Sequence, residues 1–162
     1  MKKLFVIFAL LIGTTSLISC DKTNDDEWNR FFGYSKADII GHYESTPNEE
    51  YYSEMPTQGV TVHRNVTIDI ADAGGESYVN LHIVIPDIIN VHFTGAVQLN
   101  GNDSDMAFNN NTTYTIEDFL VTVYKDKNGH IRMHGRERNG RKDSEGEVIS
   151  CKTRCFDVIK MQ

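Results

Sequence analysis

The sequence predicts an all-β protein, an antiparallel up-and-down barrel of about eight strands. From residue 60 onward, apolar and polar residues alternate in one segment after another, which is the period of a half-buried strand. Asn, Asp, Gly and Pro separate these segments at short intervals and mark turns. After residue 38, no segment of useful length has the period of a helix.

The expected strands each have one apolar face. In 60–70 that face is formed by Val60, Val62, Val66, Ile68 and Ile70. Later strands are expected at 78–85, 91–99, 106–108, 119–123, 131–133, 148–149 and 156–159. Asn128-Gly129 is the strongest hairpin signal, because both positions of such a turn need positive φ. Hairpins between neighbouring strands favour a barrel over a sandwich.

The first strand of this barrel opens with Ile39-Ile40-Gly41-His42-Tyr43-Glu44, after a short aromatic segment. These residues resemble the start of lipocalins and other calycins, in which a Gly-x-Trp on the first strand closes one end of the barrel. The similarity covers about ten residues, and Tyr43 stands where those proteins have tryptophan. It implies an architecture and no ligand. Tyr43 can equally be an ordinary strand aromatic.

The N-terminus has the pattern of a secretion signal. Lys2 and Lys3 precede the apolar run Leu4–Ile12, which is followed by small residues. Such a run is too short to cross a hydrocarbon core about 30 Å thick, so it predicts a signal peptide rather than a membrane span. We expect three parts: residues 1–19 as signal peptide, 20–34 as tether and aromatic segment, and 35–162 as the barrel domain.

The end of this signal, Leu17-Ile18-Ser19-Cys20, resembles the lipobox of bacterial lipoproteins. That resemblance implies cleavage before Cys20, acylation of its thiol and new amino group, and stable attachment to a membrane through several acyl chains. The acidic residues that follow resemble the export signal of surface lipoproteins of the Bacteroidota, although Lys22-Thr23-Asn24 interrupts them. We therefore expect an outer-membrane location, on its periplasmic or its cell-surface side.

Charge is distributed unevenly along the chain. Residues 21–124 include 4 basic and 17 acidic residues, a balance of −13. Residues 125–162 include 10 basic and 6 acidic residues, a balance of +4. Nucleic-acid binding is not expected, because it would require a larger basic face.

Cys151 and Cys155 would be the thiols that remain after lipidation of Cys20. Four residues apart in one strand, their Cα atoms would stand about 13 Å apart, whereas a disulfide needs about 4.4–6.8 Å. The apolar residues also change from odd to even positions across this stretch. We therefore predict a turn or bulge closed by a Cys151–Cys155 disulfide. A redox-active pair is the alternative.

Histidines and arginines are expected on outer faces of the sheet. The histidines at 63, 82, 92, 130 and 134 lie at polar strand positions, so no metal site and no cofactor are predicted. Arg132, Arg136 and Arg138 share one strand face. This basic row either neutralises acidic neighbouring strands or meets an anionic partner.

The segment 47–59 is expected to be a long loop at the barrel mouth, either a binding loop or a lid. Its Tyr51, Tyr52 and Met55, together with Arg141 and Lys142 in a second loop, are the candidate partner-binding residues. Nothing in the spacing assembles a catalytic set, so no enzyme is predicted. We expect a lipid-anchored module that binds or inhibits another protein, by similarity in size and anchor to the potempin-type protease inhibitors. A carrier of a small apolar ligand is the alternative.

Overall fold

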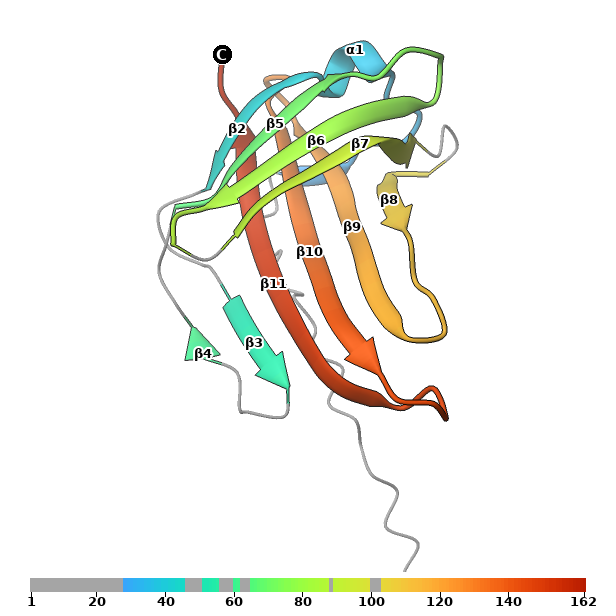
Figure 1. Ribbon diagram of the computed structural model, residues 1–162. Coiled ribbons are helices and arrows are strands. Elements are labelled where there is room, and N and C mark those ends of the chain that lie inside the picture. Colours follow the sequence, from blue (N-terminus) through green and yellow to red (C-terminus); the bar gives the residue numbers. More distant parts are fainter. Residues whose placement is uncertain (1–27, 46–50, 56–59, 62–64, 88, 100–102) are drawn as a thin grey trace, which may run out of the picture.

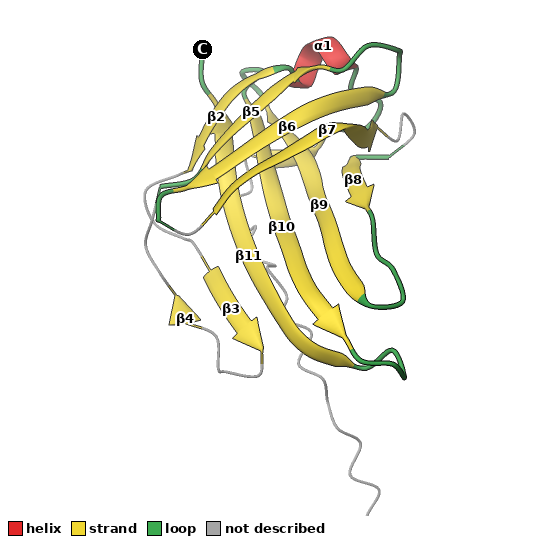
Figure 2. Cartoon of the chain, in the orientation of Figure 1, coloured by secondary structure: helices red, strands yellow, loops and turns green. Residues whose placement is uncertain are grey.

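A computed structural model describes residues 28–45, 51–55, 60–61, 65–87, 89–99 and 103–162. The elements are β1 (Trp28–Arg30), α1 (Lys36–Ile39), β2 (Gly41–Ser45), β3 (Tyr51–Met55), β4 (Val60–Thr61), β5 (Thr67–Asp72), β6 (Tyr78–Ile85), β7 (Ile89–Leu99), β8 (Asp105–Asn109), β9 (Thr115–Asp126), β10 (Ile131–Lys142) and β11 (Val148–Lys160). Figure 2 shows strands dominating the chain, and all the strand pairs in the described part are antiparallel. The all-β antiparallel class is therefore confirmed.

The strand order follows neighbouring hairpins. β2 pairs with β5, and the pairing continues through β6, β7, β8, β9 and β10 to β11, which also pairs with β2. Contact along this series is uneven. β9 and β10 share eleven residue pairs, whereas β7 and β8 share two and β2 and β11 three. These short pairings leave the sheet strongly curved but not closed into the predicted barrel.

The sheet has two distinct ends. Strands β2, β5, β6 and β7 arch across one end of the long strands β9, β10 and β11, next to α1 (Figure 1). The other ends of the long strands extend beyond this arch, with β3 and β4 at their side (Figure 1). We call these the α1 end and the hairpin end of the molecule.

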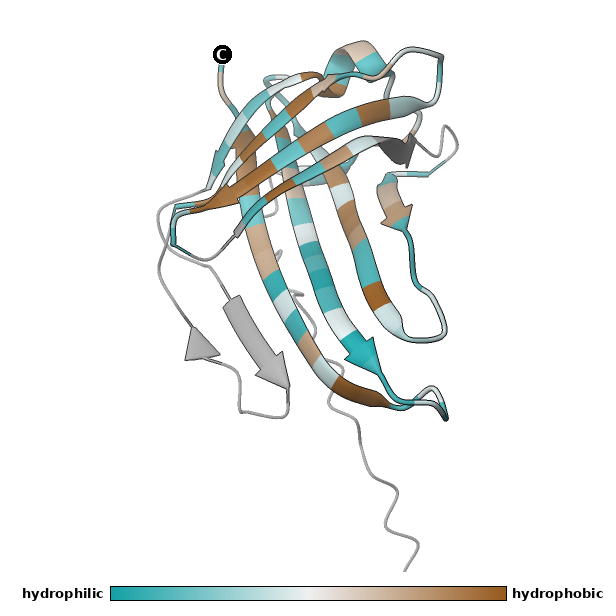
Figure 3. Ribbon diagram, in the orientation of Figure 1, coloured by the Kyte–Doolittle hydropathy of each residue, from teal (hydrophilic) through white to brown (hydrophobic). Residues whose placement is uncertain are grey.

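The core lies beneath the arch. Residues alternate between buried and exposed or half-buried along β6, where Val79, Leu81, Ile83 and Ile85 are buried, and Figure 3 shows the matching alternation of hydropathy along this strand. Phe119 of β9 packs against Phe93 and Phe156, with ring centroids 6.0 and 5.8 Å apart. The two-residue periodicity thus directs one apolar face of each strand into a shared core.

Tyr43 of β2 is part of the core next to α1. It is fully buried and donates a hydrogen bond from its hydroxyl to the carbonyl of Ile39, at 2.6 Å. The helix before it is fixed by a capping box, in which Ser35 and Asp38 bond reciprocally with each other's backbone. A buried hydroxyl with a partner explains why a tyrosine is stable at this position.

The predicted Cys151–Cys155 disulfide is not formed. Cys151 is a free, buried cysteine, and β11 runs as one strand from Val148 to Lys160. Along this strand, the even-numbered Phe156 and Val158 belong to the core, whereas the odd-numbered Ile149 is exposed. The change of apolar parity therefore reflects two faces of one strand rather than a turn, and strand geometry keeps the two cysteines apart.

Two predicted loops also contain strands. Tyr51, Tyr52 and Met55 lie in β3, which pairs with residues 151–155 of β11. Arg141 and Lys142 are the last residues of β10, opposite Ser150 and Val148 of β11. The connection between β10 and β11 is therefore residues 143–147, and Arg141 and Lys142 precede it. Part of the predicted loop 47–59, residues 47–50 and 56–59, lies outside the described residues.

Candidate functional site

The hairpin end presents a joined pair of loops. The loop between β8 and β9 and the turn between β10 and β11 meet at Lys142. Its backbone N–H donates to the carbonyl of Tyr114 at 2.8 Å, and its ammonium group donates to the carbonyl of Thr112 at 3.2 Å. These bonds hold residues that are 28 and 30 positions apart in the chain against each other.

The loop before β9 is ordered by its own side chains. The hydroxyl oxygen of Thr112 accepts hydrogen bonds from the backbone N–H groups of Tyr114 and Thr115, at 3.2 and 3.0 Å. The side-chain oxygen of Asn111 accepts from the N–H of Glu117 at 2.8 Å, and its amide group donates to Asp118 at 3.1 Å. Such side-chain to backbone bonds are what give a polar loop a defined shape.

The turn between β10 and β11 is ordered in the same way. A carboxylate oxygen of Asp143 accepts from the N–H groups of Glu145 and Glu147, both at 2.9 Å. Gly146 has φ of 87°, a left-handed conformation that suits glycine. The backbone N–H of Asp143 also donates to the carbonyl of Glu147 at 2.9 Å. Both loops of this end are therefore preorganised.

Three apolar residues are exposed here: Tyr114 in the loop before β9, and Val148 and Ile149 at the start of β11. The exposed fractions are 63% for Tyr114, 56% for Ile149 and 41% for Val148. Arg141 is also exposed and Lys142 is half-buried. We call these five residues the tip surface. Apolar side chains with charged neighbours are the composition of a protein interface, with an apolar centre and a polar rim.

The predicted binding residues come together only in part. Arg141 and Lys142 belong to the tip surface. β3 lies at the same end, but Met55 is opposite Cys151 and Cys151 is opposite Gly140, so β3 is separated from β10 by the width of β11. Sequence reasoning missed Tyr114, Val148 and Ile149. Two consecutive apolar residues directly after a polar turn were the available signal for Val148 and Ile149.

Charged residues inside and outside the sheet form ion pairs. Arg154 of β11 pairs with Glu137 of β10 in the interior, and burial raises the pKa of Glu137 although Arg154 opposes the shift. On the other face, Arg132 pairs with Asp157 and Arg138 with Asp118. The interpretation that the basic row neutralises neighbouring acidic residues is therefore confirmed for Arg132 and Arg138.

A row of histidines crosses the outer face of the arch. His42, Asp69, His82 and His92 are opposite one another on β2, β5, β6 and β7. The Nδ1 atom of His42 lies 2.6 Å from Asp69, and the rings of His82 and His92 stack at 3.9 Å. The hydrogen bond of His42 to the Asp69 carboxylate raises the pKa of His42, and burial opposes this. In the described part of the chain, no group of three or more His, Cys, Asp or Glu residues is arranged to hold a metal ion.

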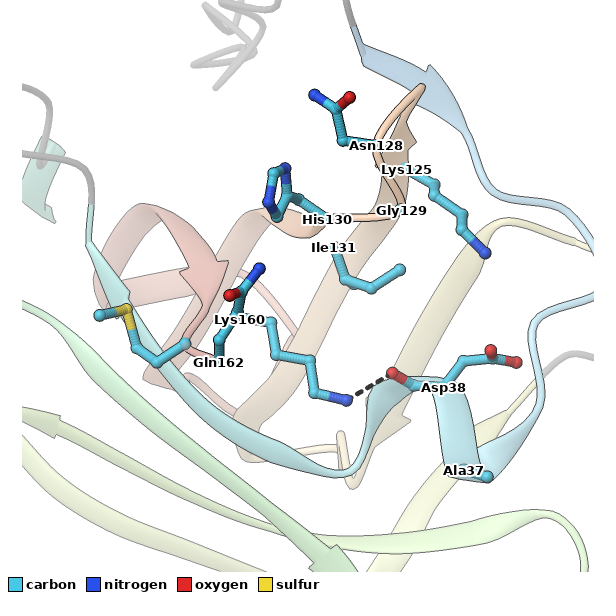
Figure 4. Close-up of a pocket in the computed structure, with 10 residues that line it drawn as sticks. Ala37, Asp38, Lys125, Asn128, Gly129, His130, Ile131, Lys160 and Gln162 are labelled. Carbon is cyan, nitrogen blue, oxygen red and sulfur yellow. Dashed lines mark hydrogen bonds between the residues drawn. The ribbon is translucent and has the colours of Figure 1, made fainter.

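A cleft of about 370 Å³ lies at the α1 end. Its walls come from α1, from the turn between β9 and β10 and from the end of β11, and Figure 4 shows Lys125 and Lys160 on two sides of it. The remaining lining residues are Ala37, Asp38, Asn128, Gly129, His130, Ile131, Met161 and Gln162. The cleft is outside the core and its lining is largely polar.

No helix within the described ranges is long and apolar enough to span a membrane.

Comparisons with known proteins identify no relative. A scan of protein-family models, a search of curated proteins and a search of solved structures found no match to this chain.

Proposed function

We propose that this chain is a lipid-anchored, non-catalytic module that binds another protein through the tip surface, and that it acts as an inhibitor or neutralising factor. The observation that carries this proposal is the exposure of Tyr114, Val148 and Ile149, which lie in or directly beside loops that are already ordered. A preordered loop loses little conformational entropy on binding, so more of its contact energy appears as affinity. Tyrosine adds a large contact area with few rotatable bonds.

The composition around these residues fits a protein partner. Arg141 and Lys142 end β10, and Glu145 and Glu147 lie in the turn that follows, so the charged residues near the apolar ones have both signs. A partner with an apolar depression bordered by polar groups of both signs would be complementary to the tip surface. A stable interface needs about 800 Å² on each side, so we expect the tip surface to form the centre of a larger contact.

Packing favours protein binding over the alternative, a carrier of a small apolar ligand. The interior face of the arch is filled by buried Val, Ile, Leu and Phe side chains. A small barrel filled by such side chains has little room for a ligand. The cleft of about 370 Å³ lies at the rim and has lysines in its wall, which does not suit an apolar guest.

The anchor is proposed from the N-terminal sequence. Cys20 lies outside the described residues, so lipidation, the outer-membrane location and membership of the Bacteroidota-type lipoproteins with a calycin-like barrel are proposals that rest on the resemblances of the lipobox and of Gly41-His42-Tyr43. A Cys20→Ala variant is expected to remain an uncut precursor without lipid. Metabolic acyl labelling equal to that of the wild type would contradict this proposal.

The binding proposal is tested by comparative capture. Residues 21–162 are immobilised as the wild type, as a tip variant (Tyr114→Ser with Ile149→Ser) and as a control variant (Tyr78→Ser) with a 44% exposed tyrosine near the α1 end. Proteins of the native envelope and secretome are quantified on each. A specific partner should remain with the control and be lost with the tip variant, and its purified form should show the same order of affinities. Equal retention by all three proteins would refute the tip surface as the binding site.

A further inference from the structure

The cleft at the α1 end is bordered by two lysines that reach it from different strands. Its volume of about 370 Å³ is within the range of about 300–1,000 Å³ typical of small-molecule sites. Lys125 comes from β9, Lys160 comes from β11, and Asp38 of α1 lies beside Lys160 (Figure 4).

Lys160 is held in a defined position. Its side chain crosses Gly41, where a Cβ would stand only 2.7 Å from the Cε of Lys160. Its ammonium group then donates to the carbonyl of Asp38 at 2.7 Å. One hydrogen bond leaves an ammonium group with further donors, because it carries three. The absence of a side chain at Gly41 thus allows the cation to reach the cleft.

Lys125 is held by an aromatic ring rather than by an acid. Its Nζ lies 4.4 Å from the centre of the Phe31 ring, a cation–π contact that leaves its N–H donors available. Within the described ranges, neither Lys125 nor Lys160 has a carboxylate oxygen within 4 Å. The two cations therefore face the cleft without an ion-pair partner from these parts of the chain.

Asp38 is the carboxylate side chain among the described residues that line the cleft, and it is already bound. An oxygen of Asp38 accepts hydrogen bonds from the backbone N–H of Ser35 at 2.7 Å and from its hydroxyl at 2.6 Å. These bonds, and to a smaller extent the charges of Lys125 and Lys160, lower the pKa of Asp38. Asp38 caps its helix, and it does not approach either lysine as an ion-pair partner.

We propose that this cleft binds a compact oxyanion, a phosphate or carboxylate group of a small molecule, between Lys125 and Lys160. Ammonium groups are strong donors to both kinds of anion. On the side of the turn between β9 and β10, residues 128–131 limit the size of the bound molecule. This site lies at the opposite end of the sheet from the tip surface, so the two proposals are independent.

The test is an NMR titration of residues 21–162 with inorganic phosphate and, separately, with malonate, at constant ionic strength. Backbone amide signals of Gly129 and Ile131 should shift and saturate with at least one of the two anions, and the anion with the lower dissociation constant identifies the preferred group. Lys125→Met and Lys160→Met should each weaken binding about tenfold, the effect of one lost charge-assisted hydrogen bond. Lys127→Met is the control, because Lys127 is in the same turn but does not line the cleft.

A second substitution should raise the anion affinity rather than lower it. Asp38→Asn retains an oxygen for the cap but removes the negative charge beside the lysines, so anion affinity should rise severalfold. Lys125 is half-buried at the surface, so its substitution leaves the fold intact and keeps the test decisive. An absence of saturable shifts with both anions, or equal affinity in the wild type and in Lys125→Met, would overturn the proposal.

Discussion

The α1 end and the hairpin end of the sheet differ in the burial of their apolar residues. At the α1 end, Tyr43 is fully buried beneath the arch and bonds to a backbone carbonyl. At the hairpin end, Tyr114 is 63% exposed on a loop held by Thr112. The side chain of Tyr43 is held by packing and a hydrogen bond, whereas hydrogen bonds hold the backbone of Tyr114. Order at the hairpin end therefore does not require burial of its apolar side chains, which remain exposed and available to a partner.

The largest expected effect is a difference in the free energy of unfolding between substitutions at the two ends. Phe119→Ala should lower the free energy of unfolding by about 3–5 kcal/mol, because it leaves a cavity between Phe93 and Phe156. Tyr114→Ala should change it by less than about 0.5 kcal/mol, because an exposed side chain buries little area. Urea denaturation of the three proteins measures both. Similar losses in the two variants would mean that the hairpin end is part of the folding core.

The boundary between the two ends is an interior ion pair. Glu137 of β10 is opposite both Phe119 of β9 and Arg154 of β11, so the apolar core gives way to charge at this level. Arg154→Met should cost about 3–5 kcal/mol, because it leaves a buried carboxylate without its cation. Adding Glu137→Leu should restore most of that loss, since an apolar pair needs no compensation. A double variant no more stable than Arg154→Met would show that the interior at this level is open to water.

Alternation of residues was sufficient to predict the α1 end. The residues that make the interior of β6 and β9, such as Leu81, Ile83, Phe119 and Val121, are those that the two-residue period assigns to one face. A hairpin at Asn128-Gly129 is confirmed, with Gly129 at φ of 89°. Asn128 is not in the positive-φ region, so the turn differs from the expected type.

The hairpin end was less predictable because its structure depends on partners distant in the chain. Tyr51–Met55 is a strand because β11 offers it an edge, and nothing local in its sequence shows this. The position of Tyr114 depends on hydrogen bonds from Lys142, 28 residues later. The burial of Asp157 and Arg132 on the outer face was also missed, because period-two alternation assigns every charged residue there to solvent.

A smaller effect tests the rigidity of the tip surface itself. Thr112→Ala removes the acceptor of the Tyr114 and Thr115 N–H groups. Amide hydrogen exchange at these two residues should accelerate, whereas the free energy of unfolding should fall by about 1 kcal/mol or less.

Thr113→Ala is the matched control for this loop, because no hydrogen bond of the Thr113 side chain is seen within the described parts of the chain. Its exchange rates should equal those of the wild type. If Thr112→Ala leaves exchange unchanged, the loop is held by Lys142 rather than by Thr112.

The smallest expected effect concerns the outer face of the α1 end. Hydrogen bonding to Asp69, with a smaller contribution from Glu44, raises the pKa of His42 above its ordinary value in the folded protein. A group with a raised folded pKa stabilises the fold fully below its unfolded pKa, about 6.5. That stabilisation is lost as the pH rises through the folded pKa. Because His42 is half-exposed, we expect only a few tenths of a kcal/mol, as for surface ion pairs.

Replacing His42 by glutamine should therefore flatten the stability profile above pH 6. In urea titrations at pH 5.5 and pH 9, the wild type should lose slightly more stability between the two values than His42→Gln does. His92→Gln is the control, because His92 stacks on His82 and has no carboxylate oxygen within 4 Å in the described residues. Its profile should follow the wild type. An equal pH dependence in the wild type and His42→Gln would show that the bond to Asp69 does not persist in solution, and that this outer face, unlike the two loops of the hairpin end, is not ordered by its polar side chains.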